Sequence, residues 1–484
     1  MERVSNYVTT DKVNSWKKGD LVAIKAQMGA GKSHFIKNIL YAIAKRDKKK
    51  ILFLIHRSRC KEQFEIELEN DNKIDIITLR TYQSIENIAM KGNQFDFNKY
   101  DYIVLDEFHY FLSDAAFNNT TDISLNQILN LTRQIKICMS ATGDYMTEYL
   151  EQIKDLSPKK YAVPFDFSYI NLLHFFYKEH TMEEYIKLAI KNNKKSIFFI
   201  NNTERAYDLH RRYKDHSLFV CSESNKYYKY VIKKKVESLL EHNRFEDLIL
   251  ITTSVLDSGV NIEDGNLHNI VISEFDDVGT LMQCVGRKRL QHKEDYINLF
   301  IHAMSNKQLG NKKGRYQSKL KIPEELKKHN ANTFSSKYGR SNYHSDMLYD
   351  EPIEDKADIV RKKINDLMYY KTKINITEID KMLKLGEFGY CEYISNIFEK
   401  EYNILEVDKS KDRLSAYLDS VVGERLFKEG QESLKKEFKK NDLKSRTLGI
   451  NTLNGWLVDK EIPYIIIPKR TNKKRYWVVE EIDR

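Results

Sequence analysis

The sequence has few cysteines and no long apolar run. Its five cysteines lie far apart, and no two of them have the C-x-x-C spacing of zinc sites and iron–sulfur clusters. Their scatter also gives no disulfide framework. No apolar run approaches the roughly 20 residues that cross a bilayer, and no apolar signal region opens the sequence. We therefore expect a cytoplasmic protein without metal–sulfur sites and without a membrane partner.

The length and the charge indicate several domains with an uneven surface. The 484 residues leave room for about three domains of ordinary size, and 41% hydrophobic residues are enough for real cores. The net charge is +10, and residues 301–484 hold 37 Lys and Arg against 29 Asp and Glu. The C-terminal third is therefore the expected contact surface for a polyanion. A solvated, Lys-rich surface would give the same charge.

The stretch from residue 21 to residue 44 has the order strand, glycine loop, helix. An apolar strand at 21–24 is followed by the loop Ala-Gln-Met-Gly-Ala-Gly-Lys-Ser at 26–33. Apolar residues with helical spacing follow at Ile36, Ile39, Leu40 and Ile43. This order is typical of a phosphate-binding P-loop. Loop amides surround phosphates, Lys32 adds a charge at the outer phosphates, and Ser33 can reach Mg²⁺. A chance Gly-Lys-Ser turn is the alternative, and the flanking elements argue against it.

Residues 1–160 alternate apolar strands with helical patterns, which predicts a parallel sheet covered on both faces. The expected strands are 21–24, 51–55, 75–78, 103–105 and 135–139. Asp106 and Glu107 directly follow the fourth strand. Buried carboxylates are costly unless they meet a cation or a water to activate. In a P-loop ATPase the Asp holds Mg²⁺ and the Glu polarises the attacking water. An exposed acidic turn is the alternative.

A second α/β unit follows Pro158 and has no phosphate loop of its own. Its expected strands are 196–200, 218–220, 248–252, 270–273 and 297–301, and it ends in Gln-Cys-Val-Gly-Arg-Lys-Arg at 283–289. Taken alone, the two arginines indicate a solvated basic turn. If this unit faces the first across a nucleotide, they can supply positive charge to the transferring phosphate.

The C-terminal part is divided by composition. Residues 306–354 are polar with little apolar periodicity, which predicts a linker or a mobile loop. Helical spacing returns from residue 355. We expect residues 424–484 to form a winged-helix-like unit with a hairpin of strands 464–467 and 476–479. The turn between them carries Lys469, Arg470, Lys473, Lys474 and Arg475. These cations would bind nucleic acid, or else form a solubilising turn.

Taken as an ordered set, these segments resemble a superfamily 2 helicase of the DExH type. The likeness spans roughly residues 18–302. Its motifs correspond to 26–33 (I), 55–58 (Ia), 80–84 (Ib), 106–109 (II), 140–142 (III), 196–201 (IV), 252–261 (V) and 283–289 (VI). The form of motif VI, with Tyr-Gln-Ser-Ile at 82–85, is most similar to helicases of phages, mobile elements and herpesvirus-type origin-binding proteins. The resemblance implies an α/β protein with two tandem RecA-like lobes, 1–160 and 161–305. It places the linker 306–354 and a mostly helical accessory nucleic-acid-binding region, 355–484, after them.

The resemblance also implies roles for single residues, with ATP and Mg²⁺ as cofactors. The implied nucleotide contacts are Gln27, Met28, Gly29, Ala30, Gly31, Lys32, Ser33, Gly259 and Asn261, and Mg²⁺ is assigned to Ser33 and Asp106. Catalysis is assigned to Glu107 as base, to Arg287 and Arg289 as arginine fingers, and to Gln283 beside the nucleotide or its water. Ser140 and Thr142 would couple hydrolysis to lobe movement, and Arg57, Thr81 and Thr253 would contact the nucleic-acid backbone.

Three departures from the family pattern qualify these roles. Motif VI lacks the usual glycine before Arg289, motif V ends in Asn261 where Asp is common, and no Q-motif precedes the P-loop. Adenine specificity is therefore unsupported. The implied function is an ATP-dependent helicase or translocase on nucleic acid, DNA favoured, in replication or a related mobile-element process. The alternatives are an RNA helicase, or an ATP-switched sensor or remodeller in a defence system. Replication or defence proteins are the expected protein partners.

Overall fold

The computed structural model describes most of the chain, in two compact units. The described residues are 2–56, 58–116, 118, 120–253, 260–275, 277–292, 294–329, 331–338, 345–353, 356–405, 409–440, 443, 448–460, 462–471 and 474–482. The first unit is Met1–Leu405 and the second is Glu406–Arg484. Each unit has its own hydrophobic core.

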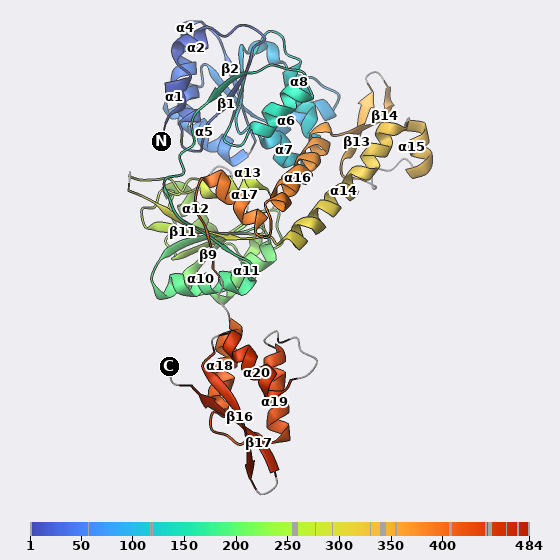
Figure 1. Cartoon of the computed structure of the whole chain (residues 1–484). Helices are drawn as coiled ribbons and strands as arrows, with labels where there is room; N and C mark the ends of the chain where they lie inside the picture. The colour runs from blue at the N-terminus through green and yellow to red at the C-terminus, as the bar shows by residue number, and fades with distance from the viewer. Residues whose placement is uncertain are drawn as a thin grey trace. The chain divides into compact units, whose positions relative to one another are not determined.

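Lobe 1 of the first unit is a six-stranded, fully parallel sheet with the strand order β3-β2-β4-β5-β1-β6 (Figure 1). Its strands are β1 (Leu21–Lys25), β2 (Ile51–Ile55), β3 (Ile77–Thr81), β4 (Tyr102–Leu105), β5 (Ile135–Ser140) and β6 (Lys159–Ala162). The expected strand 75–78 is therefore placed two residues too early. Asp75 is exposed and pairs with Lys45, whereas the buried alternation begins at Ile77.

Helices cover both faces of this sheet, and each face has a core. The helices include α1 (Val4–Tyr7), α2 (Thr10–Asn14), α5 (Ser58–Asn70), α6 (Tyr82–Met90), α7 (Tyr110–Ser113), α8 (Thr121–Leu129) and α9 (Asp144–Gln152). The helix after the P-loop consists of α3 (Lys32–His34), the π-helical segment η1 (Phe35–Leu40) and α4 (Tyr41–Arg46). Its predicted apolar face is buried at Ile36, Leu40 and Ile43.

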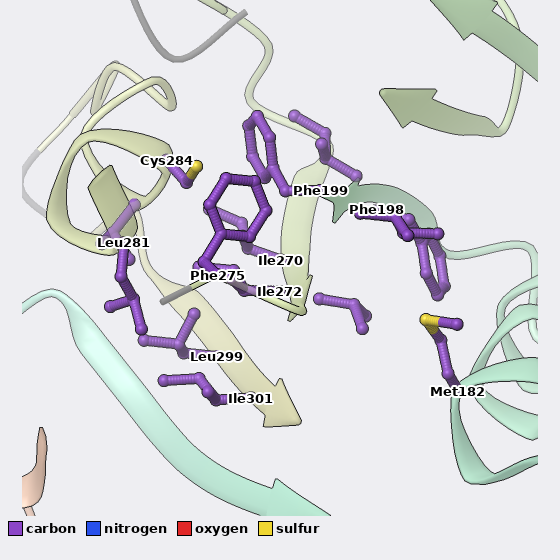
Figure 2. Close-up of a cluster of buried hydrophobic side chains, with 14 of the residues drawn as sticks. Met182, Phe198, Phe199, Ile270, Ile272, Phe275, Leu281, Cys284, Leu299 and Ile301 are labelled. Carbon is purple, nitrogen blue, oxygen red and sulfur yellow. The ribbon is translucent and has the colours of Figure 1, made fainter. Parts of the chain in front are cut away.

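Lobe 2 is a seven-stranded parallel sheet with the order β15-β7-β12-β11-β8-β10-β9. Its strands are β7 (Ile170–Phe176), β8 (Lys195–Ile200), β9 (Ser217–Val220), β10 (Ile249–Thr252), β11 (Leu267–Ser273), β12 (Ile297–His302) and β15 (Asn403–Ile404). Its helices are α10 (Glu179–Lys191), α11 (Thr203–Arg212), α12 (Lys233–His242) and α13 (Val278–Val285). Figure 2 shows part of its core, in which Phe199 of β8 lies near Ile270 and Ile272 of β11, whereas Phe198 lies near Met182 of α10.

The lobe 2 sheet extends beyond the predicted strands. Sequence analysis did not predict β7 or β15, and β15 comes from far along the chain, where Asn403 pairs with His174 and Ile404 with Phe175. The sheet of lobe 2 is therefore completed by residues outside the predicted range 161–305.

The predicted linker at 306–354 is wrong, because most of it is regular structure. It contains α14 (Asn306–Lys328), α15 (Ala331–Tyr338) and β13 (Leu348–Ile353), which pairs with β14 (Lys356–Ile364). A capping box between Ser305 and Gln308 starts α14. Only a few of its residues, such as Leu309 and Leu320, are buried, so the sequence carries little apolar periodicity. It packs against α16 (Asp366–Lys384), which is followed by α17 (Gly389–Phe398).

The second unit contains three helices and a hairpin around one core. The elements are α18 (Lys409–Val421), α19 (Lys428–Lys440), α20 (Ile450–Asp459), β16 (Tyr464–Thr471) and β17 (Lys474–Glu481). Leu426, between α18 and α19, forms an isolated antiparallel bridge with Trp477 of β17. The hairpin is longer than predicted. Lys469 and Arg470 lie in β16, and Lys474 and Arg475 lie in β17, because the cross-strand pairing continues to Thr471 and Lys474.

The expected fold class is confirmed: two α/β lobes, RecA-like in having parallel sheets covered by helices, precede a largely helical C-terminal region. The finer winged-helix assignment stays a prediction. Within the described ranges, no helix is long and apolar enough to cross a membrane.

Candidate nucleotide site between the lobes

The two lobes enclose a cavity of about 280 Å³. It is lined by Ser33, Phe53, Ile55, His56, Phe64, Glu67, Asp106, Glu107 and His109 from lobe 1, and by Asn261, Gln283, Arg287 and Arg289 from lobe 2. Seven residues that the sequence singled out in separate motifs thus line one cavity: Ser33, Asp106, Glu107, Asn261, Gln283, Arg287 and Arg289. The carboxyl ends of β1 and β4 carry the lobe 1 members, as expected for a parallel sheet.

The P-loop has the backbone of a phosphate cradle. Gly29 and Gly31 both have φ of +82°, in the left-handed region that favours glycine. The ammonium of Lys32 donates to the carbonyl of Ala26 at 3.1 Å, and the residue is only 8% exposed. The Ala30 amide donates to the carbonyl of Gln27 at 3.1 Å. The loop is therefore wrapped around its own lysine at the start of α3.

The side chain of Gln27 points away from this cradle. Its Nε2 donates to the carbonyl of Asp166 at 3.2 Å, and its Oε1 accepts from the Asp166 amide at 2.9 Å. Asp166 lies in the segment that joins the lobes. Gln27 can therefore serve a nucleotide only through its backbone, and its side chain ties the P-loop to the crossing between the lobes.

Met28 brings the P-loop against lobe 2. Its Sδ lies 3.9 Å from a guanidinium nitrogen of Arg287. A Cβ placed on Gly286 would lie 2.2 Å from the same sulfur. Gly286 is therefore the residue that lets motif VI approach the P-loop this closely.

The two carboxylates after β4 respond differently to their surroundings. Burial, and then the neighbouring Glu107, raise the pKa of Asp106. Burial alone would raise the pKa of Glu107, but nearby positive groups, led by Lys32, outweigh it and lower that pKa. Glu107 has a left-handed φ of +45°, and its Oε2 is buried without a hydrogen-bond partner among the described residues. A bound group that carries positive charge or a hydrogen-bond donor would stabilise the carboxylates of Asp106 and Glu107.

The donor set fits Mg²⁺. Ser33 and Asp106 offer a hydroxyl and a carboxylate to the same cavity, and Mg²⁺ commonly takes one or two protein oxygens, with phosphates and waters as its other ligands. Over the described part of the chain, no group of three or more His, Cys, Asp or Glu side chains could hold a metal by itself.

His109 joins three predicted motifs. Its Nδ1 lies 2.9 Å from the hydroxyl of Ser140 and 3.4 Å from Oε2 of Glu107. Its Nε2 contacts the side-chain amide of Gln283 in lobe 2. The Thr142 amide donates to the Ser140 hydroxyl at 3.0 Å. The predicted coupling residues Ser140 and Thr142 are thus linked through His109 to both the acidic pair and motif VI.

The two predicted arginine fingers are held differently. Arg287 is 6% exposed, and its Nε donates to the carbonyl of Gln283 at 3.2 Å. Arg289 donates from Nε to Oδ1 of Asn261 at 2.9 Å. Burial, and then the nearby Arg287, lower the pKa of Arg289 to about 10. The Asn261 side chain therefore positions an arginine in this structure.

Of the predicted nucleic-acid residues described in the first unit, Thr81 and Thr253 do not line this cavity. Thr81 caps α6, where its hydroxyl accepts from the Ser84 amide at 3.2 Å, and Thr253 is buried at the end of β10. Lys469, Arg470, Lys474 and Arg475 belong to the second unit. Arg57, Gly259 and Lys473 lie outside the described residues.

Sequence analysis missed three polar residues of the cavity wall. His109 was noted only as part of motif II, although its position after the acidic pair was a usable signal. His56 follows β2, and it adds to the positive charge that lowers the pKa of Glu107. Glu67 on α5 pairs with Lys37 at 2.6 Å, and nothing in the local sequence indicates that it would reach the cavity.

A second cavity of about 570 Å³ lies where both lobes meet α16 and α17. Lys371 of α16 forms an ion pair with Asp277, whose Oδ2 accepts from the Thr280 amide at the start of α13. About two helical turns further on, Glu378 accepts from the hydroxyls of Tyr145 in lobe 1 and Tyr393 in α17, at 3.0 and 3.3 Å. Helix α16 therefore contacts both lobes through polar side chains.

Residues 2–144 match the family model described as Type III restriction enzyme, res subunit. The match covers less than a third of the chain, and for lobe 1 it supports the likeness to superfamily 2 helicases. A comparison with the curated proteins found no match. The DExH subtype and the likeness to origin-binding proteins stay predictions.

The chain is also similar to several solved structures. One is Mss116p bound to ssRNA and AMP-PNP, with 16% identity over 60% of this chain and 67% of that chain, and a TM-score of 0.45. A second is S. cerevisiae Dbp5 bound to RNA and ADP BeF3, with 16% identity, 59% and 80% coverage, and a TM-score of 0.44. A third is Mycobacterium smegmatis helicase Lhr bound to ssDNA and AMP-PNP, with 14% identity, 62% and 41% coverage, and a TM-score of 0.37. With TM-scores this low, these similarities do not define what this chain binds.

Proposed function

We propose that this chain is an ATP-dependent nucleic-acid helicase or translocase. One observation carries the proposal. A P-loop serine and an acidic pair from lobe 1 line a single cavity together with a glutamine and two arginines from lobe 2. A nucleotide bound there would contact both lobes, so its hydrolysis would change the contact between them.

In this proposal the lobe 1 residues bind the nucleotide and activate the attacking water. The amides of residues 27–33 and the ammonium of Lys32 hold the phosphates. Ser33 and Asp106 would hold Mg²⁺, which neutralises charge on the phosphates when it is bound. Glu107 orients the attacking water or accepts its proton, and the positive groups that lower its pKa keep this carboxylate ionised, as an acceptor must be.

The lobe 2 residues complete the site. Arg287 supplies positive charge to the transferring phosphate, an effect that acts mainly in the transition state. Arg289 is the second candidate, and its Nε is engaged by Asn261. Gln283 would transmit a change at the nucleotide to His109, which it contacts and which also contacts Ser140. Through these contacts a change at the acidic pair reaches motif III and motif VI together.

DNA is the favoured substrate, in replication or a related mobile-element process. The sequence resemblance and the basic C-terminal third support a polyanionic partner. Contacts to the backbone by Thr81 and Thr253 would not select the sugar, whereas a contact to the 2′-hydroxyl would. An RNA helicase is therefore the alternative within this class, and replication or defence proteins are the proposed protein partners.

The second unit is proposed as a winged-helix-like nucleic-acid module of the accessory region. Its order of three helices and a hairpin supports this assignment. Arg470 and Arg475 face each other across the hairpin, so their charges repel, and a phosphate would relieve that repulsion. Lys469 pairs with Glu480 at 2.6 Å and is therefore the weakest candidate of the set.

One comparison tests the proposal. ATP hydrolysis is measured without nucleic acid and with single- and double-stranded DNA and RNA, beside strand displacement on the matching duplexes. We expect hydrolysis that nucleic acid stimulates, and ATP-dependent displacement that Glu107→Gln abolishes. Stimulated hydrolysis without displacement would favour the ATP-switched sensor or remodeller. No hydrolysis under any of these conditions would refute the assignment as an ATPase.

A further inference from the structure

Three tyrosine rings stack on the surface of lobe 2. Tyr207 lies on α11, and Tyr227 and Tyr230 lie in the segment after β9. The centroid of the Tyr207 ring is 5.1 Å from that of Tyr227 and 4.3 Å from that of Tyr230, with interplanar angles of 30° and 20°. Tyr207 also contacts Phe219 of the core, with centroids 5.7 Å apart. The stack is therefore anchored in the core and ends in Tyr230, which is 42% exposed.

Lysines surround these rings. The ammonium of Lys226 lies 5.0 Å from the centroid of Tyr227, and that of Lys229 lies 5.1 Å from the centroid of Tyr230. Residues 221–235 contain five lysines and a single acid, Glu223. Lys235 pairs with Asp247, whereas the other four lysines are exposed and form no ion pair with the described residues. This surface has a strong excess of positive charge beside flat aromatic groups.

The segment that carries the rings is held in place. The side-chain amide of Asn225 donates to the hydroxyl of Thr203 at 3.2 Å, and its Oδ1 accepts from the Tyr227 amide at 3.0 Å. Thr203 begins α11, the helix that carries Tyr207. The three rings are thus arranged before any ligand arrives, which lowers the entropy cost of binding.

The stack lies at the carboxyl ends of strands β9 and β10, where ligands of parallel sheets are expected. Strands β9 and β10 run parallel, with Val220 opposite Thr252. Residues 221–230 therefore leave the sheet at the same edge as Thr253, a proposed nucleic-acid contact. In open parallel sheets ligands gather at this carboxyl edge.

We propose that Tyr207, Tyr227 and Tyr230, with Lys226 and Lys229, form a platform that binds single-stranded nucleic acid. A base stacks on the exposed ring of Tyr230 and continues the series of rings, while the lysines contact neighbouring phosphates. The platform rests on the proposed function and adds a specific contact to it. It favours single strands, because bases in a duplex do not expose their faces.

The matched control lies at the opposite edge of the same sheet. Tyr296 is 38% exposed, stacks on His268 at 4.4 Å, and directly precedes β12. Lys191 and Lys194 are exposed and precede β8. The first control variant, Tyr296→Ala, removes an exposed tyrosine ring from a surface without a proposed role. The second control variant combines Lys191→Gln with Lys194→Gln and removes two exposed lysines from it.

The first experiment measures binding of the full chain to labelled oligothymidine and oligouridine by fluorescence anisotropy. We expect Tyr230→Ala to weaken binding about tenfold, as for the loss of one base–aromatic stack, and Tyr230→Phe to bind like the wild type. Replacing Lys226 and Lys229 by Gln should lower the slope of log affinity against log salt by about 1.4, or roughly 0.7 for each phosphate contact. The control variants should change neither quantity, and basal ATP hydrolysis should stay unchanged in all variants.

A second measurement keeps the test independent of any loss of stability. Oligonucleotides that carry 5-bromouracil are irradiated with the wild-type chain, and the cross-linked peptide is identified by mass spectrometry. We expect the cross-link within residues 227–230. If Tyr230→Ala binds within about twofold of Tyr296→Ala and the cross-link lies elsewhere, the platform is wrong and the proposed motor stands. If the wild type binds no nucleic acid, both the platform and the proposed function are wrong.

Discussion

Lys371 of α16 forms an ion pair with Asp277, the residue that caps α13 and so precedes Gln283 and Arg287 on the chain. The pair is partly buried, and Lys371 outweighs the effect of burial to lower the pKa of Asp277 to about 2. A helix outside both lobes thus holds the start of the motif VI helix.

Lys371→Met should destabilise the first unit by about 1 kcal/mol, because it leaves a partly buried carboxylate without its charged partner. The free energy of unfolding is measured by urea titration, with the exposed Lys384→Met as control. The deficit should be pH-dependent. A carboxylate whose folded pKa is lowered contributes stability above its unfolded pKa and loses it as the pH falls. The deficit should therefore be full above about pH 4 and shrink toward pH 2, and a deficit that does not change with pH would contradict the ion-pair role.

Lys32→Ala should abolish ATP hydrolysis and weaken nucleotide binding, because one charged contact to the outer phosphates is lost. Binding is measured with a fluorescent ATP analogue, and hydrolysis by phosphate release. Normal hydrolysis by this variant would remove residues 26–33 from the nucleotide site.

Glu107→Gln should retain nucleotide binding and lower turnover by about 10²- to 10⁴-fold, the range typical of a lost general base. The substitution keeps the size of the side chain and removes only its charge and proton affinity. The same two assays separate the effects. An unchanged hydrolysis rate would show that another group activates the water.

Arg287→Ala should leave nucleotide affinity nearly intact and lower the hydrolysis rate by about 10³-fold, because an arginine finger acts mainly in the transition state. Arg289→Ala should be milder, since its guanidinium is engaged by Asn261. Single-turnover hydrolysis and equilibrium binding are compared for both variants. An equal loss of binding and rate in Arg287→Ala would indicate a structural role for that residue.

Gly286→Ala should slow ATP hydrolysis, because the new methyl group would collide with the sulfur of Met28. Met28→Ala removes that sulfur, so the double variant should recover part of the rate. Steady-state hydrolysis of the four proteins gives the coupling between the two sites. If the double variant is no faster than Gly286→Ala alone, the contact between the P-loop and motif VI does not limit the reaction.

The parts of the fold that the sequence predicted are those with local signals. Strands β1, β2 and β4 are largely apolar runs in a sheet covered on both faces, and the P-loop and the acidic pair follow β1 and β4. Helix α14 was missed because most of its surface is exposed, so its apolar spacing is weak. The strand β15 is two residues long and pairs with a segment more than 200 positions earlier, which no local pattern encodes.

The candidate site likewise has a part that the sequence predicted and a part that it did not. Motif spacing identified the residues that line the cavity, but it could not indicate where each side chain points. Gln27 was expected at the nucleotide and instead bonds to Asp166, and Asn261 engages Arg289. The polar contacts of α16 with Asp277 and Tyr145 join residues far apart in sequence, and each residue taken alone is an ordinary charged or aromatic position.

The chain returns to lobe 2 at β15. The segment from α14 to α17 is therefore a long insertion within the sequence of that lobe. A fragment that ends at residue 305 would expose the backbone groups of β7 that pair with β15, at His174 and Phe175, and an open strand edge invites pairing with other chains. Such a fragment would therefore tend to associate or aggregate even though its motifs are all present. The smallest fragment that contains both complete lobes should extend through Leu405.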